Sequence, residues 1–161
     1  DAKLERILVV LADGRPFGPE TLDVGGRPLP VPKAAGPVAV FDFLELCARP
    51  LGPADYLALT ERFGVVVLRG VPLLGPDRRN EARRLVTLVD ALYERKVILV
   101  TSAAAEPEAL YPEGEGAFEF RRTVSRLREM QSRDWLERCR ARRPEDLPAS
   151  FTAFALTSDL S

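Results

Sequence analysis

The stretch Val65-Val66-Val67-Leu68, taken with Val97-Ile98-Leu99-Val100, decides the fold class. Both runs are short, continuous and apolar, which is typical of strands that are covered on both faces of a parallel sheet. Between them, residues 77–95 carry an apolar stripe at the helical period, formed by Ala82, Leu85, Val86, Val89, Leu92 and Tyr93. A strand, a helix and a second strand form a βαβ unit with a right-handed crossover. The sequence therefore predicts an α/β fold with a parallel sheet.

Further elements flank this unit on both sides. Upstream, residues 38–41 predict a strand, and residues 44–47 and 53–62 predict helices. Downstream, we expect helices over about residues 118–130 and 134–142. Residues 38–145 are thus expected to form an α/β domain with C-terminal helices, and residues 146–161 a C-terminal tail.

The first 37 residues have a different character. Residues 1–11 predict a short amphipathic helix, and Gly25-Gly26 predicts the turn of a β-hairpin within residues 20–32. Prolines in this hairpin cannot donate hydrogen bonds to a sheet, so it is expected at an edge or outside the main sheet. Residues 33–37 are expected to be a linker. Residues 1–37 are therefore predicted to be an appendage made of a helix, a β-hairpin and a linker.

Composition excludes several function classes. The chain has 161 residues, with 23 basic and 24 acidic side chains and no histidine. Without histidine, Ser-His-Asp and Cys-His catalysis and histidine-ligated metal sites are excluded. The near-neutral charge gives no global reason to bind nucleic acid or an anionic membrane, so at most peripheral membrane association is expected.

The two cysteines and the chain ends indicate the compartment. Cys47 and Cys139 are too few for a disulfide framework and are expected to be reduced structural thiols. No apolar run is long enough to cross a bilayer, and no signal peptide is visible. We expect a cytoplasmic protein or, alternatively, one of an organelle matrix. The lack of an initiator Met predicts a piece of a longer chain.

Polar side chains follow the second core strand. Ligands of parallel sheets bind outside the carboxyl ends of the strands, which makes the hydroxyls of Thr101 and Ser102 candidate ligand contacts. Alternatively, these hydroxyls satisfy backbone groups of the loop. No Gly-x-x-x-x-Gly-Lys-Ser/Thr phosphate loop is present, and no strand ends in an acidic pair that would hold magnesium. We expect this chain alone not to hydrolyse ATP, and we expect it to hold no cofactor and no metal.

Arginine supplies all but three of the basic residues. Arg122 and Arg126 lie four positions apart, so they share one helix face and can jointly meet a phosphate or a carboxylate. The alternative is a solvated helix surface with salt bridges. No aromatic residues alternate with the arginines to stack bases, so no nucleic-acid partner is expected.

Five stretches resemble the ZapE-type cell-division ATPases and their mitochondrial relatives, the ATPase-family-gene-one proteins. The resemblance runs in order through about residues 20–135. It is carried by FDFLELCARPLGPADYL (residues 41–57), RNEARRLVTLVDALY (79–93), SA (102–103), LYPEG (110–114) and FEFRRTVSRLREMQS (118–132).

The resemblance implies a P-loop ATPase of the AAA+ type, which uses ATP and magnesium in the full-length protein. It implies that this chain is the C-terminal portion, without the phosphate loop and the magnesium-binding strand. Arg122 and Arg126 match arginines of the family, and one of them is expected to contact nucleotide phosphate, within a subunit or across an interface. Asn80 and Arg84 are candidates for a subunit interface.

The resemblance also implies partners and a setting. They are the N-terminal half of the same ATPase or further copies of it, and a protein substrate such as a division-ring protein. A bacterial cytoplasm is expected, with a mitochondrion as the alternative. Two other functions remain open: a stand-alone adaptor that binds a protein and no nucleotide, and a small enzyme that uses Asp or Glu as acid and base.

Overall fold

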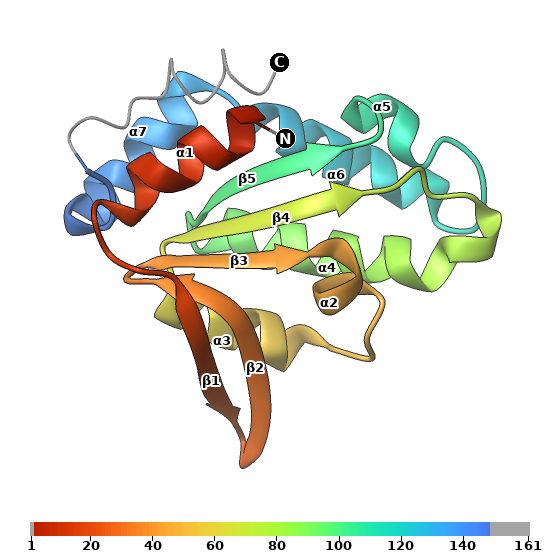
Figure 1. The fold of residues 1–161 in the computed structure, drawn as a ribbon. Coiled ribbons are helices and arrows are strands. Elements are labelled where there is room, and N and C mark those ends of the chain that lie inside the picture. The colour runs from red at the N-terminus through yellow and green to blue at the C-terminus, as the bar shows by residue number, and fades with distance from the viewer. Residues whose placement is uncertain (1, 149–161) are drawn as a thin grey trace.

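A computed structural model describes residues 2–148, and its centre is one five-stranded sheet in the order β1-β2-β3-β4-β5 (Figure 1). The strands are β1 (Gly18–Val24), β2 (Arg27–Ala35), β3 (Val38–Asp42), β4 (Val65–Val71) and β5 (Ile98–Ala103). β3, β4 and β5 are parallel, whereas β1, β2 and β3 pair antiparallel. The α/β class and the parallel pairing of the core strands are confirmed. The sheet as a whole is mixed rather than parallel, because the N-terminal hairpin continues it at one edge.

The prediction of a linker over residues 33–37 is wrong. Lys33, Ala34 and Ala35 belong to β2 and pair with Val40, Ala39 and Val38 of β3. Gly36 makes the turn between the two strands with φ of +55°, a conformation that L side chains rarely adopt. Alanine has a low intrinsic preference for strands, but pairing with β3 and burial of Ala34 and Ala35 outweigh it.

Seven α-helices surround the sheet in the described residues. They are α1 (Ala2–Ala12), α2 (Phe43–Cys47), α3 (Pro53–Arg62), α4 (Arg79–Glu94), α5 (Pro107–Leu110), α6 (Ala117–Glu129) and α7 (Arg133–Arg142). α1 lies on one face of the sheet, and α3, α4 and α6 lie on the other (Figure 1). All predicted helices are present, and α4 begins two residues later than expected because Pro76–Arg78 form a 3₁₀ turn.

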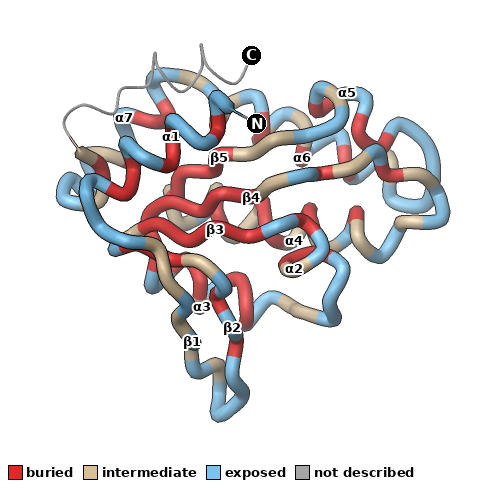
Figure 2. Tube along the Cα trace, in the orientation of Figure 1, coloured by how far each residue is buried: buried red, intermediate tan, exposed pale blue. Residues whose placement is uncertain are grey.

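The core lies where the sequence predicts it. Residues 65–68 are fully buried, as continuous apolar parallel strands require. α4 buries Ala82, Leu85, Leu88, Val89 and Leu92, and the buried segments concentrate in the sheet and on the helix faces toward it (Figure 2). The apolar stripe of this helix is thus confirmed, with Val86 and Tyr93 only half-buried at its margins.

The C-terminal region is described only to residue 148. Pro144–Asp146 form a 3₁₀ turn and Leu147 is buried, while residues 149–161 of the expected tail lie outside the described residues. The division into segments 1–37, 38–145 and 146–161 stays a prediction. In the described part of the chain, no helix combines the length and the apolar character needed to span a membrane.

Candidate functional site

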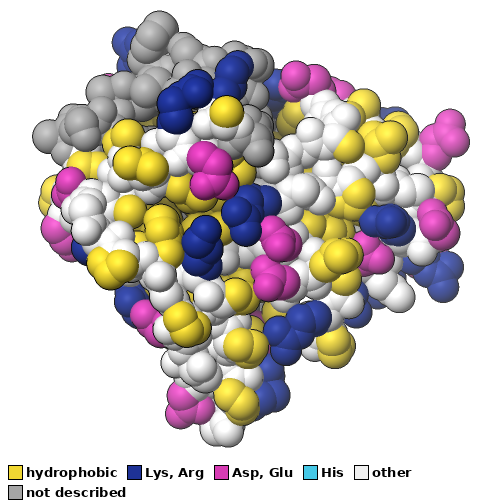
Figure 3. All heavy atoms as spheres, viewed as in Figure 1, with side chains coloured by type: hydrophobic (Ala, Val, Ile, Leu, Met, Phe, Trp, Pro, Cys, Tyr) yellow, Lys and Arg dark blue, Asp and Glu magenta, His cyan; other side chains and the backbone are white. Residues whose placement is uncertain are grey.

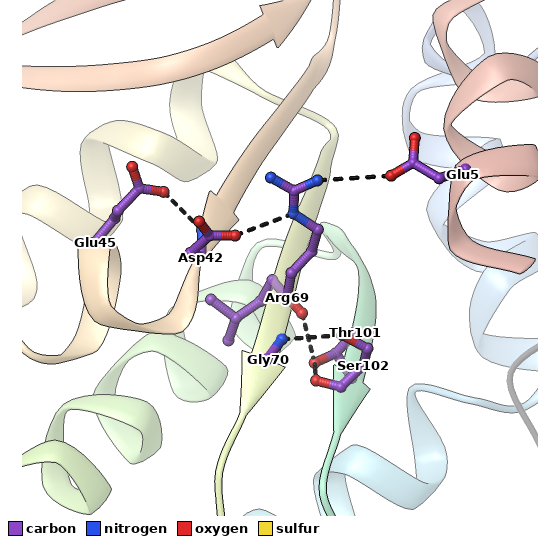
Figure 4. A network of polar contacts seen from close by, with 8 residues as sticks. Glu5, Asp42, Glu45, Arg69, Gly70, Thr101 and Ser102 are labelled. Atoms are coloured by element: carbon purple, nitrogen blue, oxygen red, sulfur yellow. Dashed lines mark hydrogen bonds and ion pairs between the residues drawn. The ribbon is translucent and has the colours of Figure 1, made fainter. Parts of the chain in front are cut away.

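The carboxyl ends of the three parallel strands meet at one edge of the sheet, where ligands of α/β proteins bind. Asp42 ends β3 and lies in register with Arg69 of β4, and Thr101 and Ser102 lie near the end of β5 (Figure 4). The parallel register therefore brings the predicted candidates Thr101 and Ser102 to the same edge of the sheet as Asp42 and Arg69.

Arg69 lies between two carboxylates at this edge. Its Nε donates to Asp42 Oδ1 at 3.1 Å, and its Nη1 lies 3.8 Å from Glu5 Oε1 of α1 (Figure 4). Asp42 is the N-cap of α2, and its backbone N–H donates to Glu45 Oε1 at 2.8 Å in a capping box. Arg69 is thus neutralised within the chain. Basic and acidic side chains lie next to one another on this face of the molecule (Figure 3).

The two hydroxyls at the end of β5 bond to the backbone of β4. Thr101 Oγ1 donates to the carbonyl of Leu68 at 2.9 Å, and Ser102 Oγ accepts from the N–H of Gly70 at 2.9 Å. Between Leu68 and Val71 the register of β4 shifts, and Gly70 has φ of +73°. The hydroxyls therefore satisfy backbone groups at this irregularity, which is the alternative that the sequence left open, and a ligand contact by Thr101 or Ser102 stays a prediction.

Arg122 and Arg126 share one face of α6, as predicted, and both contact a carboxylate of α4. Arg122 Nη2 lies 3.3 Å from Asp90 Oδ2, and Arg126 Nη1 forms a short ion pair with Asp90 Oδ1. Arg126 also lies 3.6 Å from Glu94, and its guanidinium stacks 4.6 Å above the ring of Tyr93. The side chain of Arg126 is only 19% exposed, whereas that of Arg122 is 67% exposed. The two arginines are therefore not equivalent.

The ring of Tyr93 extends this cluster toward α7. Tyr93 stacks on Trp135 at 4.9 Å between ring centroids, and its hydroxyl donates to Glu129 at 2.9 Å. The hydrogen bond to Glu129, with a smaller contribution from burial, raises the pKa of Tyr93. Through these contacts, Arg126 of α6, Tyr93 of α4 and Trp135 of α7 pack against one another.

The strand-end residues and the arginine pair lie apart. Asp90 lies in the last two turns of α4, which leads into the start of β5, whereas Thr101 and Ser102 lie near its other end. Among the described residues, no hydrogen bond or ion pair joins the two sets. The structure therefore contains two separate candidate regions.

The two interface candidates lie in the first half of α4. Asn80 is exposed. Arg84 is half-buried, and its Nη1 donates to the carbonyl of Cys47 at 3.1 Å, which ties α4 to α2. The interface role of Asn80 and Arg84 stays a prediction.

Both cysteines are free and buried, and burial raises the pKa of the Cys47 thiol to about 12.

The pairing of Arg69 with Asp42 was not predicted from the sequence. The signal was available, because each is the first charged residue after an apolar strand, and neighbouring parallel strands end at the same edge. Within residues 2–148, no group of three His, Cys, Asp or Glu side chains is arranged to hold a metal ion.

Comparisons with known proteins agree with the resemblance seen in the sequence. A family model described as AFG1-like ATPase matches residues 1–139. The cell division protein ZapE of Escherichia coli (strain K12) is 36% identical over 137 residues, which are 85% of this chain and 36% of that protein. Lactation elevated protein 1 homolog B of Danio rerio is 33% identical over 149 residues, covering 73% of this chain and 30% of that protein. The chain thus spans about a third of the length of these relatives. No solved structure matches it significantly.

Proposed function

Because the chain belongs to the AFG1-like ATPase family, we propose that it is the C-terminal part of a protein that hydrolyses ATP with magnesium. The family match over residues 1–139 is the observation that carries this proposal. The chain itself lacks a phosphate loop, and its described residues do not fit a magnesium site. The phosphate loop and the magnesium ligands then belong to another part of the full-length protein, and this chain alone is inactive.

The arrangement of the sheet supports the assignment of the phosphate loop to another part of the full-length protein. β5 lies at one edge of the sheet, yet residues 98–100 are buried as in an internal strand. The outer edge of β5 has no strand partner among the described residues. In this proposal the rest of the protein continues the sheet beyond β5 and completes an AAA+ P-loop domain.

Arg122 is the residue that this proposal assigns to nucleotide phosphate. It is largely exposed, and among the described residues its one ion pair, with Asp90, has a length of 3.3 Å. If Arg122 turns outward, Asp90 keeps its short contact with Arg126, so the carboxylate is not left unpaired. A mobile guanidinium can neutralise charge on phosphoryl oxygens, within the subunit or across an interface between copies. Arg126 acts as a positioning residue that holds Asp90.

The test is ATP turnover by the full-length protein. Arg122→Ala is expected to lower kcat by a factor on the order of 10³, while the melting temperature stays unchanged because the side chain is exposed. Arg121→Ala is the matched control, since Arg121 is an exposed neighbour whose guanidinium stacks over the ring of Phe118. Turnover of Arg122→Ala at the wild-type rate would remove Arg122 from the site.

The proposal extends to the biological setting. ZapE is named a cell division protein, and we propose the same process for the full-length form of this chain, with a protein substrate such as a division-ring protein. We propose that the full-length protein acts in a bacterial cytoplasm, contacts membranes at most peripherally and has no nucleic-acid partner. For the alternative setting, a mitochondrion, we propose quality control of membrane proteins as the process.

A further inference from the structure

A groove runs between the free edge of the hairpin and α3. Its volume is about 460 Å³. It is lined by Leu22, Asp23 and Val24 of β1, by Gly25 of the turn, and by Ala54, Ala58, Glu61 and Arg62 of α3. The acidic residues Asp23 and Glu61 are exposed, and they are called the rim of the groove below. No residue of β2 lines it, so the groove follows the outer edge of β1. β1 is the edge strand of the sheet, and the hairpin projects away from the body of the molecule (Figure 1).

The register determines which backbone groups this edge offers. Val24 pairs with Arg27 across the two-residue turn Gly25-Gly26, so this is a hydrogen-bonded pair and the pairs along the hairpin alternate from there. Thr21 and Asp23 fall in the non-bonded positions, opposite Pro30 and Pro28. Their N–H and C=O groups therefore point outward, toward the groove side of β1.

The opposite edge of the hairpin is closed by proline. Pro28 and Pro30 occupy the positions of β2 whose N–H groups would point away from β1, and this half of β2 extends beyond its pairing with β3. Proline at such positions prevents another strand from pairing. The hairpin thus has one edge closed to strand addition and one edge open, with a groove beside the open edge.

We propose that the free edge of β1 binds an extended, basic segment of a partner protein as an added strand. Backbone hydrogen bonds to Thr21 and Asp23 supply binding energy, and alternate side chains of the segment enter the groove. The small side chains of Ala54 and Ala58 leave room there for apolar residues.

The charges at the rim select a basic segment. Among the described residues, neither Asp23 nor Glu61 forms an ion pair; Asp23 Oδ1 accepts only from the N–H of Gly26 in the turn, at 2.8 Å. Arg62, in contrast, is paired with Glu20 through two contacts of 2.7 and 2.9 Å. A lysine or arginine of the partner would meet the two acidic side chains. A second copy of this chain is disfavoured, because pairing β1 with itself brings the same acidic residues together. This inference is independent of ATP hydrolysis.

The test is selection of a random 12-residue displayed peptide library on the full-length protein, followed by titration of the best synthetic peptide by fluorescence anisotropy. We expect enriched peptides to alternate apolar residues and to contain Lys or Arg. Thr21→Pro removes an outward N–H and is expected to weaken binding about tenfold, whereas Thr21→Val keeps the N–H and is expected to bind like wild type. Glu61→Arg is expected to weaken basic peptides several-fold.

Folding of the variants is checked by circular dichroism and thermal melting. If Thr21→Pro unfolds the hairpin, Ala58→Arg provides the same test from α3, because it fills the groove and repels a basic peptide while the backbone of β1 is intact. Failure to enrich any alternating basic peptide would overturn the proposal. So would a selected peptide that binds Thr21→Pro or Ala58→Arg as tightly as wild type.

Discussion

At the scale of single residues, Asp55 shows how one carboxylate joins two elements. It is 2% exposed; its Oδ1 lies 2.7 Å from Arg27 Nη1 of β2, and its Oδ2 accepts from the N–H of Gly52 at 2.8 Å. Burial alone raises the pKa of Asp55, but the hydrogen bonds from Arg27 and Gly52 outweigh it, so the pKa lies below its ordinary value. Asp55 thus holds the hairpin against the start of α3.

Asp55→Asn is expected to lower the free energy of unfolding by about 1–3 kcal/mol at pH 7, because a buried charge-assisted contact is lost while Arg27 stays half in solvent. The stabilisation from a lowered pKa is complete above the unfolded value of about 3.9 and is lost as pH falls through the folded value. The difference between wild type and variant should therefore shrink below about pH 4. Urea unfolding of both proteins at pH 7 and pH 3 measures this difference in the free energy of unfolding.

Asp134→Asn is the control for this experiment, since Asp134 is exposed in the first turn of α7. It should change stability by no more than about 0.5 kcal/mol. A loss for Asp55→Asn that is the same at both pH values would show that the charge of Asp55 does not contribute.

At the scale of elements, α4 organises the molecule. One face buries Leu85, Leu88 and Val89 against the sheet, and the start of the helix is held to α2 through Arg84. Its last turns carry Asp90 and Tyr93, which contact α6 and α7. A single helix therefore links the parallel strands to the arginine cluster.

Leu85→Ala is expected to destabilise the protein by about 2–5 kcal/mol, because it removes buried methyl groups and leaves a cavity beneath α4. Arg83→Ala, on the exposed side of the same helix, is the matched control and should cost less than about 1 kcal/mol, since its ion pair with Glu115 is exposed. Thermal unfolding of both variants checks this. Equal melting temperatures would mean that the apolar face of α4 contributes little to stability.

At the scale of the whole molecule, the described residues form a core and a sheet but not a complete nucleotide site. Arg69 is paired with Asp42 and Glu5, and no three metal-binding side chains come together in residues 2–148. The chain also spans only about a third of its relatives. Nucleotide binding is therefore expected to require the rest of the protein.

Calorimetric titration with ATP and magnesium checks this expectation on the 161-residue chain and on the full-length protein. We expect binding only by the full-length protein, because one exposed arginine without a phosphate loop offers too few contacts. Tight binding by the short chain would contradict the assignment of the phosphate loop to another part. If neither protein binds ATP, the adaptor function takes the place of the ATPase.

The sequence by itself determined the three core strands, six of the seven helices of the described residues, the hairpin turn and the family. These features follow from local periodicity and from motifs, which act over a few neighbouring residues. It also placed Arg122 and Arg126 on one face of a helix, since a spacing of four is enough for that.

Only the tertiary structure decided which of these groups meet. It joined the hairpin to the sheet through the segment expected as a linker, and it paired Arg69 with Asp42. It buried Arg126 against Asp90 and Tyr93 while leaving Arg122 exposed. The contacts of Arg122 and Arg126 with Asp90 join residues 32 and 36 positions apart, so they depend on how helices pack across the fold rather than on any local pattern.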